Sequence, residues 1–194
     1  LSGFFNWAAD RHMIENVPIR RGMKAIKRET ARDRWLKDEE LRAVWNAAEV
    51  VGYPFGPLVR MLVLTGQRLR QVAGMKWDEL YHLDGDTPVW RVPSERMKGK
   101  REHELPLSRS AATLLQDLKL LGLCNEFVFA TRGRDGEAAP INWFSKPKAR
   151  LDMLSGVQDW RLHDLRRTVA TNLEDMGIER ITISTILAHH IPGV

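Results

Sequence analysis

The chain has 194 residues, of which 43% are hydrophobic and 28% charged, a composition that excludes a disordered chain and suits one folded domain with an appendage. Its single cysteine excludes an internal disulfide, no apolar run reaches the ~18 residues of a membrane-spanning helix, and the N-terminus lacks the marks of a signal peptide. Residues 1–37 hold nine Lys and Arg against four Asp and Glu, whereas residues 38–194 hold 21 of each, so the net charge of +5 lies wholly in the N-terminal segment. Phosphate binding elsewhere must therefore come from local placement of basic side chains.

The first 34 residues divide into two segments. Within residues 1–17, apolar side chains at helical spacing predict a helix over residues 1–14 that is closed by Pro18. Residues 18–34 are basic and poor in large apolar side chains, which is typical of a linker between domains. Two interpretations of this linker stay open: a solvated connection, or an arm that lies along a DNA phosphate backbone. In the second, the DNA-binding residues are Arg20, Arg21, Lys24, Lys27 and Arg28.

From residue 35 onward the pattern predicts a mainly α domain with a small three-stranded antiparallel β-sheet. A helix over residues 37–50 is followed by a buried helix that ends at Thr65-Gly66, and a further helix begins at Arg68. Three short strands, separated by glycine-containing turns, are expected over residues 79–83, 89–93 and 102–107. An extended piece and a loop are expected over residues 127–140. Further helices are expected over residues 111–122, 142–154, 163–176 and 179–189, and the helix over residues 142–154 is expected to be interrupted or restarted at Pro147.

Two arginines stand at predicted helix starts. Arg68 follows the turn Thr65-Gly66-Gln67, and Arg166 follows His163 by three residues, so that His163 and Arg166 share one helix face. A guanidinium presents a rigid fork of donors to two phosphate oxygens, and a helix start adds partial positive charge. Taken singly these signals are weak, because such an arginine is most often a surface residue and a lone histidine is most often a core or capping residue. Together they predict a clamp for an oxyanion.

Two further basic groups fit the same chemistry. Lys98 stands in the turn of the second hairpin, with Lys100 and Arg101 beside it, and can pair with phosphates or protonate a leaving oxygen. Charged hairpin tips are otherwise usually only solvated. His189, in the segment Leu187-Ala188-His189-His190, can bond a phosphate oxygen. A metal-dependent phosphohydrolase is the other class that His163-Asp164 suggests, but the remaining histidines form no persuasive ligand set, so we expect no metal and no cofactor.

Taken in order, the segments TGQR, ERMKGKREHELPLS, HDLRRT and LAHH resemble the catalytic domain of the phage-integrase, or tyrosine-recombinase, family over residues 35–194. The segments MKGKREHELPLS and ILAHHIPGV are most similar to the prophage and genomic-island type. Residues 1–17 resemble the last helix of the core DNA-binding domain in that family. The resemblance implies a metal-independent, site-specific DNA recombinase of the bacterial cytoplasm and nucleoid. It would act on double-stranded DNA as a homotetramer in the synaptic complex, with the present chain monomeric when alone.

The resemblance assigns a role to each motif residue. Arg68 and Arg166 fit the two catalytic arginines, Lys98 the hairpin lysine, and His163 and His189 the two histidines. The family transfers DNA strands through a 3′-phosphotyrosyl intermediate, and fixed donors stabilise the charge that grows on the phosphate oxygens. One departure is Gln71, where many relatives have a glutamate that orients the first arginine. We interpret it as tuning of the arginine.

The nucleophile is the element that the sequence does not supply. Its two tyrosines are Tyr53, in a Gly/Pro turn, and Tyr81, on a predicted strand. In the family the tyrosine follows the second histidine by roughly nine residues, which here falls beyond Val194. We therefore expect residues 35–194 to be a catalytic domain truncated before its nucleophile, and the chain as given to form no covalent intermediate.

Three alternatives remain open. An enzyme of the type IB topoisomerase kind shares this chemistry without site specificity. A catalytically inactive DNA-binding regulator could use the same fold if the parent protein lacked the tyrosine. A plain basic helical domain would require the four motifs to occur together by coincidence.

Overall fold

The computed structural model describes residues 2–18, 32–97, 99–133 and 135–188, which fall into two compact units, Leu1–Asp33 and Arg34–Val194. The first unit contains helix α1 (Ser2–Asp10). His12, with a φ of 55°, takes the left-handed conformation, and the N–H of Met13 donates to the Ala8 carbonyl at 2.9 Å. This is the bonding of a Schellman motif. The helix predicted over residues 1–14 therefore ends at Asp10, before Pro18 is reached.

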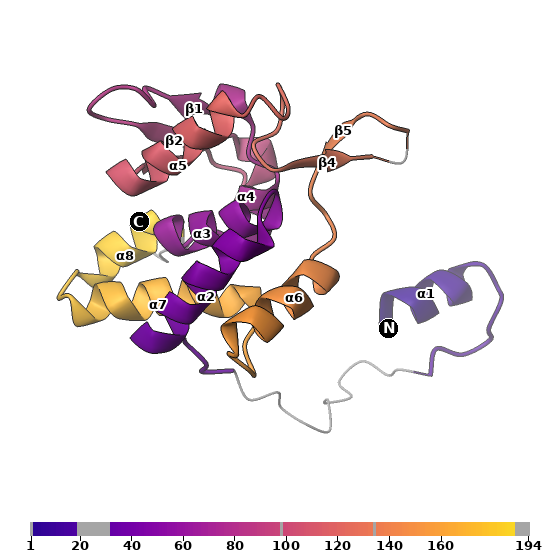
Figure 1. The fold of residues 1–194 in the computed structure, drawn as a ribbon. Helices are drawn as coiled ribbons and strands as arrows, with labels where there is room; N and C mark the ends of the chain where they lie inside the picture. Colours follow the sequence, from indigo (N-terminus) through magenta and orange to yellow (C-terminus); the bar gives the residue numbers. More distant parts are fainter. Residues whose placement is uncertain (1, 19–31, 98, 134, 189–194) are drawn as a thin grey trace. The chain divides into compact units, whose positions relative to one another are not determined.

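The second unit is built around α3 (Phe55–Thr65), which packs against α2 (Asp38–Val51), α5 (Arg109–Leu120) and α7 (Leu162–Asp175). Figure 1 shows α2 crossing α3 and α7, with α6 (Ser145–Ser155) beside it. A Cβ at Gly56 would lie 2.0 Å from the Ala48 carbonyl oxygen, so α2 and α3 can cross this closely only with glycine there. The expected helix over residues 37–50 and the buried helix ending at Thr65-Gly66 are confirmed.

A three-stranded antiparallel sheet of order β1-β2-β3 lies at the α5 end of this unit (Figure 1). Its strands are β1 (Leu80–Tyr81), β2 (Val89–Val92) and β3 (His103–Pro106). Trp90 of β2 pairs with Leu80 and Leu105 on either side and is completely buried. The three predicted strands are confirmed in shorter form. The 3-10 helix η1 (Trp77–Glu79) takes up the first residue of the first predicted strand, and a second 3-10 helix, η2 (Ser94–Arg96), follows β2.

The prediction of a single sheet was incomplete. Residues 127–140 contain a second antiparallel pair, β4 (Ala130–Arg132) and β5 (Ala138–Pro140), where only an extended piece and a loop were expected. Strands of three residues are too short to show an alternating pattern in the sequence.

The interruption expected at Pro147 does not occur in α6. Pro147 lies in the first turn of this helix, where the N–H that proline lacks would have no partner within the helix.

The C-terminal helices form the part of the fold that holds the candidate site. α7 ends in a second Schellman motif, in which Gly177 has a φ of 80° and the N–H of Ile178 donates to the Leu173 carbonyl. α8 (Arg180–Ile186) follows and packs against α7. It ends at Ile186, before the predicted end at residue 189. No helix in the described ranges is long and apolar enough to cross a membrane.

Candidate active site

The turn at the end of α3 is the point where the candidate site is assembled. Gly66 ends the helix with a left-handed φ of 63°, and its N–H donates to the Leu62 carbonyl at 2.9 Å. A Cβ on Gly66 would lie 2.8 Å from Leu187 Cδ2 and 2.9 Å from Val169 Cγ1. Glycine is therefore required twice at this position, once for the backbone angle and once for the close approach of α7 and of the residue that follows α8.

Arg166 lies on α7 and reaches this turn as a buried cation. Its side chain is 5% exposed, one guanidinium nitrogen donates to the Gly66 carbonyl at 2.8 Å, and the other donates to the Leu187 carbonyl. Among the described residues no carboxylate forms an ion pair with it. Burial and then the charge of Arg68 lower the pKa of Arg166 to about 10. A buried guanidinium with only carbonyl partners favours the arrival of an anion.

Arg68 is the N-terminal capping residue of α4 (Leu69–Ala73) and is held through its backbone. Its N–H donates to Gln71 Oε1 at 3.0 Å, and its guanidinium donates to the Ala188 carbonyl at 3.4 Å. Gln71 is buried, and its Nε2 bonds Met97 Sδ at 2.7 Å. The Gln71 amide therefore acts on Arg68 through the backbone N–H of the arginine. Arg68 is left with no carboxylate partner within the described ranges.

His163 stands in the first turn of α7, three residues before Arg166. Partial burial lowers the pKa of this exposed imidazole, and the charges of Arg167 and Arg166 lower it further. The negative charge of Asp164, whose carboxylate pairs with Arg167 at 2.6 Å, opposes that shift. The imidazole is therefore neutral at pH 7 and can accept a proton. Arg166 and Arg68 bind the consecutive carbonyls of Leu187 and Ala188, and His163 lies one turn before Arg166 on α7.

The segment that precedes Lys98 is anchored to α4, the helix that Arg68 caps. Met97 is buried against Gln71, and the Arg96 guanidinium donates both to the Gln71 carbonyl and to the buried carboxylate of Glu79. The same carboxylate accepts from the Trp90 indole at 3.0 Å. Residues of α4, η1 and β2 therefore hold η2 and Met97, the segment just before the lysine.

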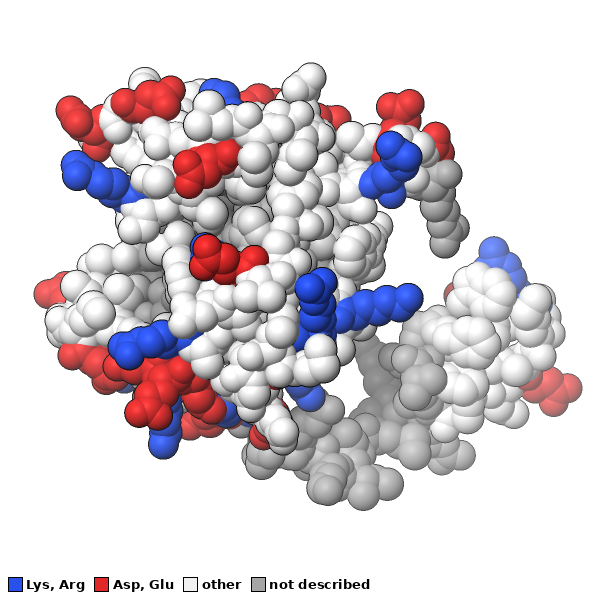
Figure 2. Space-filling model, viewed as in Figure 1, with Lys and Arg blue, Asp and Glu red and all other residues white. Residues whose placement is uncertain are grey.

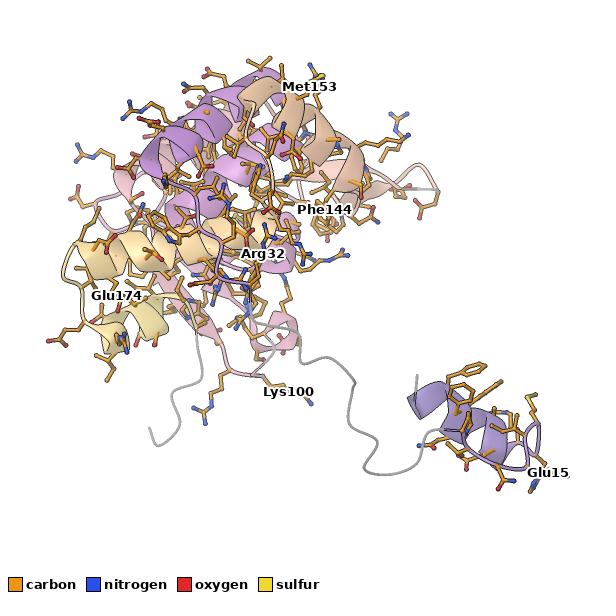
Figure 3. The ribbon with its side chains drawn as sticks, turned by 90° about the horizontal axis from the view of Figure 1, so that it is seen from below. Glu15, Arg32, Lys100, Phe144, Met153 and Glu174 are labelled. Atoms are coloured by element: carbon orange, nitrogen blue, oxygen red, sulfur yellow. The ribbon has the colours of Figure 1, made fainter. Side chains whose placement is uncertain are left out.

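Several sequence-predicted site residues lie outside the described ranges. They are Lys98 and His189 of the catalytic set and Arg20, Arg21, Lys24, Lys27 and Arg28 of the basic linker. Lys100 and Arg101 are described, and both are exposed. Figure 3 shows Lys100 on a loop that projects from the body of the second unit. That loop joins η2 to β3, which agrees with its predicted place at a hairpin tip.

Both tyrosines lie away from this turn. The Tyr53 hydroxyl donates to the Val128 carbonyl at 3.3 Å and accepts from the Ala130 N–H at 2.8 Å, so both of its bonding roles are occupied. Tyr53 precedes α3, and the site lies beyond its far end, about 16 Å along a helix of 11 residues. Tyr81 is on β1, at the opposite edge of the sheet from β3, with the Arg91 guanidinium over its ring.

Two residues near the site, the half-buried His103 and the buried Gln67, were not identified from sequence. His103, on β3, has its Nε2 at 3.2 Å from the Ile186 carbonyl oxygen, and Gln67 Nε2 donates to the same oxygen at 2.7 Å. The charges of Arg166 and Arg68 help to lower the pKa of His103, after burial. The only sequence signal was position, since His103 follows the Lys98 turn and Gln67 precedes Arg68. No group of three or more potential metal-ligating side chains occurs in the parts of the chain that are described.

Comparison with known proteins agrees with this geometry. A model of the phage integrase family matches residues 34–192. Prophage integrase IntA of Escherichia coli (strain K12) is 32% identical over 127 residues, which cover 66% of this chain and 29% of that protein. Prophage integrase IntZ of the same strain is 28% identical over 190 residues, which cover 97% of this chain and 46% of that protein. The chain thus spans less than half the length of either relative.

Solved structures share the fold at lower identity. Lambda integrase (75–356), solved as a dimer bound to a COC′ core site, aligns with a TM-score of 0.68 and 22% identity over 98% of this chain and 69% of that one. XerH site-specific recombinase bound to its difH substrate aligns with a TM-score of 0.66 and 19% identity over 97% of this chain and 56% of that one. The chain belongs to the phage integrase family, and it has the catalytic-domain fold of the tyrosine recombinases, of the prophage-integrase type.

Proposed function

We propose that this chain supplies the phosphate-activating part of a site-specific DNA recombinase that moves a mobile element through a 3′-phosphotyrosyl intermediate. One observation carries the proposal: two guanidiniums without carboxylate partners in the described residues bind the consecutive carbonyls of Leu187 and Ala188, and a histidine of lowered pKa lies one helical turn before one of them. Such an arrangement suits a dianionic phosphorane transition state. No step of the proposed reaction requires a metal ion or a cofactor.

In the proposed reaction a phenol oxygen attacks the phosphorus and the bond from phosphorus to the 5′ oxygen breaks. Arg68 and Arg166 stabilise the charge on the non-bridging oxygens, and His189 adds a further hydrogen bond. His163 accepts the phenol proton, and Lys98 donates a proton to the departing 5′ oxygen. The products are a 3′-phosphotyrosyl bond and a free 5′-hydroxyl, whose attack on a second phosphotyrosine reverses the step.

The nucleophile in this proposal is neither of the two tyrosines in the sequence. Tyr53 has its hydroxyl bonded on both sides by backbone groups, and Tyr81 lies on the outer strand of the sheet. A tyrosine roughly nine residues after His189 would lie beyond Val194. The chain as given is therefore expected to bind DNA without forming the covalent intermediate.

The proposed partner is double-stranded DNA, held by a tetramer in the synaptic complex. Lambda integrase has been solved as a tetramer bound to a Holliday junction, which supports this assembly for a protein of the same fold. On the face shown in Figure 2 the second unit carries basic and acidic side chains interspersed. Residues 18–34 would then be a basic arm along the backbone, and residues 1–17 the end of a core DNA-binding domain.

Recombination between two sites tests the proposal. The full product of the gene is incubated with a supercoiled plasmid that carries two copies of the attachment sequence of the element. We expect deletion or inversion between the copies, and no product with Arg166→Ala. Relaxation without exchange would instead indicate a topoisomerase, and binding without strand cleavage an inactive regulator. Either result would overturn the proposed function.

A further inference from the structure

We propose that His103 is a positioning residue, which together with Gln67 holds the end of α8 in the place that both arginines use. The proposal rests on the function proposed above and adds a residue to its site. It concerns a side chain that lies in the segment ERMKGKREHELPLS but was given no role when the site was predicted.

Three successive carbonyl groups at the end of α8 are bound by side chains from other segments. The Ile186 carbonyl oxygen accepts a hydrogen bond from Gln67 Nε2 at 2.7 Å and lies 3.2 Å from His103 Nε2. The Leu187 carbonyl oxygen accepts a hydrogen bond from the Arg166 guanidinium, and the Ala188 carbonyl oxygen accepts one from the Arg68 guanidinium at 3.4 Å. The side chains come from the α3–α4 turn, from β3 and from α7. A displacement of this short stretch would therefore move an acceptor of each arginine.

The backbone at this stretch depends on these bonds. The last carbonyls of a helix have no partner within it and carry partial negative charge, so they need external donors. Ala188 also adopts a left-handed φ of 49°, which a residue with a side chain keeps only when its surroundings hold it. Gln67 is 1% exposed and approaches from the Arg68 side. His103 approaches from β3, and is the one described side chain of the three-stranded sheet with a hydrogen bond to this stretch.

The contact with the Ile186 carbonyl requires a hydrogen-bond donor, which the imidazole can supply without a charge. A neutral imidazole that carries its proton on Nε2 donates to the Ile186 carbonyl. Burial and the neighbouring Arg166 and Arg68 charges lower the pKa of His103, which keeps the ring neutral at pH 7. A glutamine has an N–H donor at a similar distance from the backbone and can replace this bond. A leucine fills comparable space and cannot.

The experiment compares His103→Gln and His103→Leu in the full product of the gene, with covalent protein–DNA adduct formation as the readout. We expect His103→Leu to slow cleavage at saturating DNA by about 10- to 100-fold, since small misplacement of catalytic groups has effects of that size. DNA affinity should change less than about twofold, because the bond positions the arginines and contacts no DNA. His103→Gln should restore most of the rate.

A matched control removes a similar bond elsewhere. Gln116 on α5 donates from its Nε2 to the Leu83 carbonyl at 2.7 Å, and Gln116→Leu should leave the cleavage rate unchanged. Equal losses in His103→Gln and His103→Leu would overturn the proposal and indicate that the imidazole acts by charge or proton transfer. Wild-type rates in both variants would overturn it as well.

Hydrogen exchange of the 194-residue chain gives a readout without activity. Amides of residues 183–188 should exchange faster in His103→Leu than in the wild type, and His103→Gln should restore their protection. Unchanged exchange would overturn the anchoring role. If the wild-type protein formed no adduct, the proposed function would fail, whereas this exchange measurement would still decide whether His103 holds α8.

Discussion

At the scale of single residues, the buried charge of Arg166 has the largest calculable effect on stability. With a pKa lowered to about 10 from 12.5, the folded state binds its proton more weakly than the unfolded chain does. The buried charge therefore destabilises the fold by about 3 kcal/mol at neutral pH, and this penalty disappears only as the pH rises above about 10. A bound anion would offset the same penalty. The site is thus less stable empty than occupied.

Anion binding should appear as stabilisation of the 194-residue chain. Sulfate at ten times its Kd should raise the free energy of unfolding by about 1.4 kcal/mol, because it binds the folded state alone. Arg166→Met should lose this gain. Arg180→Met, which removes an arginine that is 89% exposed and paired with Glu174, should keep it. Thermal unfolding at increasing sulfate measures the effect, and an equal gain in wild type and Arg166→Met would refute the anion site.

His163 should titrate below its ordinary pKa of 6.5. The folded protein disfavours the charged imidazole. His163 therefore leaves the free energy of unfolding unchanged above pH 6.5 and lowers it as the pH falls from 6.5 toward the pKa of the folded state. Arg167→Gln should raise the pKa, because it removes the largest charge that opposes protonation. NMR of the imidazole Cε1–H resonance gives both values. A His163 pKa above 6.5, or one lowered further by Arg167→Gln, would contradict this electrostatic account.

At the scale of elements, Arg96 joins the segment before Lys98 to η1 through an ion pair with Glu79, and to α4 through a hydrogen bond to the Gln71 carbonyl. Arg96 and Glu79 have side chains that are 22% and 6% exposed, and Glu79 also accepts from Trp90. Removing one charge leaves the other uncompensated inside the fold. This connection links the segment before Lys98 to the one after Arg68.

A double-mutant cycle should detect that link. Glu79→Gln alone should lower the free energy of unfolding by about 2–4 kcal/mol, and the double change with Arg96→Met by less than the sum of the single effects. The control pair Arg91 and Glu104 lies in the same sheet with side chains 42% and 53% exposed, and its coupling should stay below about 1 kcal/mol. Denaturant unfolding measures all four variants of each cycle. Equal coupling in the two pairs would contradict the assigned role of the buried one.

The elements also indicate what sequence could predict. Helices such as α2 and α3 have apolar faces long enough to show the period of 3.6 residues, and the turn at Gly66 follows from residue type. The hairpin of β4 and β5 has no such pattern. The end of α8 is set by Gln67, His103 and Arg166, which are far from it in the chain, so its boundary could not be read locally. Motif order identified Arg68, His163 and Arg166, but not His103, whose bond spans 83 residues.

At the scale of the whole molecule, charge is divided unevenly between the two parts of the chain. The excess of five positive charges lies in residues 1–37, and the site draws on local placement instead. The two interpretations of the linker, a DNA-binding arm or a solvated connection, differ in their dependence on salt.

Neutralising the linker should distinguish them. If Arg20, Arg21, Lys24, Lys27 and Arg28 contact phosphates, changing all five to glutamine should weaken duplex binding and reduce the slope of log K against log salt by about 4. Fluorescence anisotropy of the 194-residue chain with duplex DNA at several salt concentrations measures the slope. The same slope before and after the change would show that the linker is only solvated.

The most direct test of the central claim is covalent capture of DNA by the full product of the gene on a nicked suicide substrate that carries its site. We expect a protein–DNA adduct to form. Arg166→Ala should slow its formation at least about 10²-fold, and Arg180→Ala should not slow it. It also expects no adduct from the 194-residue chain. Adduct formation by Arg166→Ala at the wild-type rate, or by the 194-residue chain in a way that Tyr81→Phe abolishes, would contradict it.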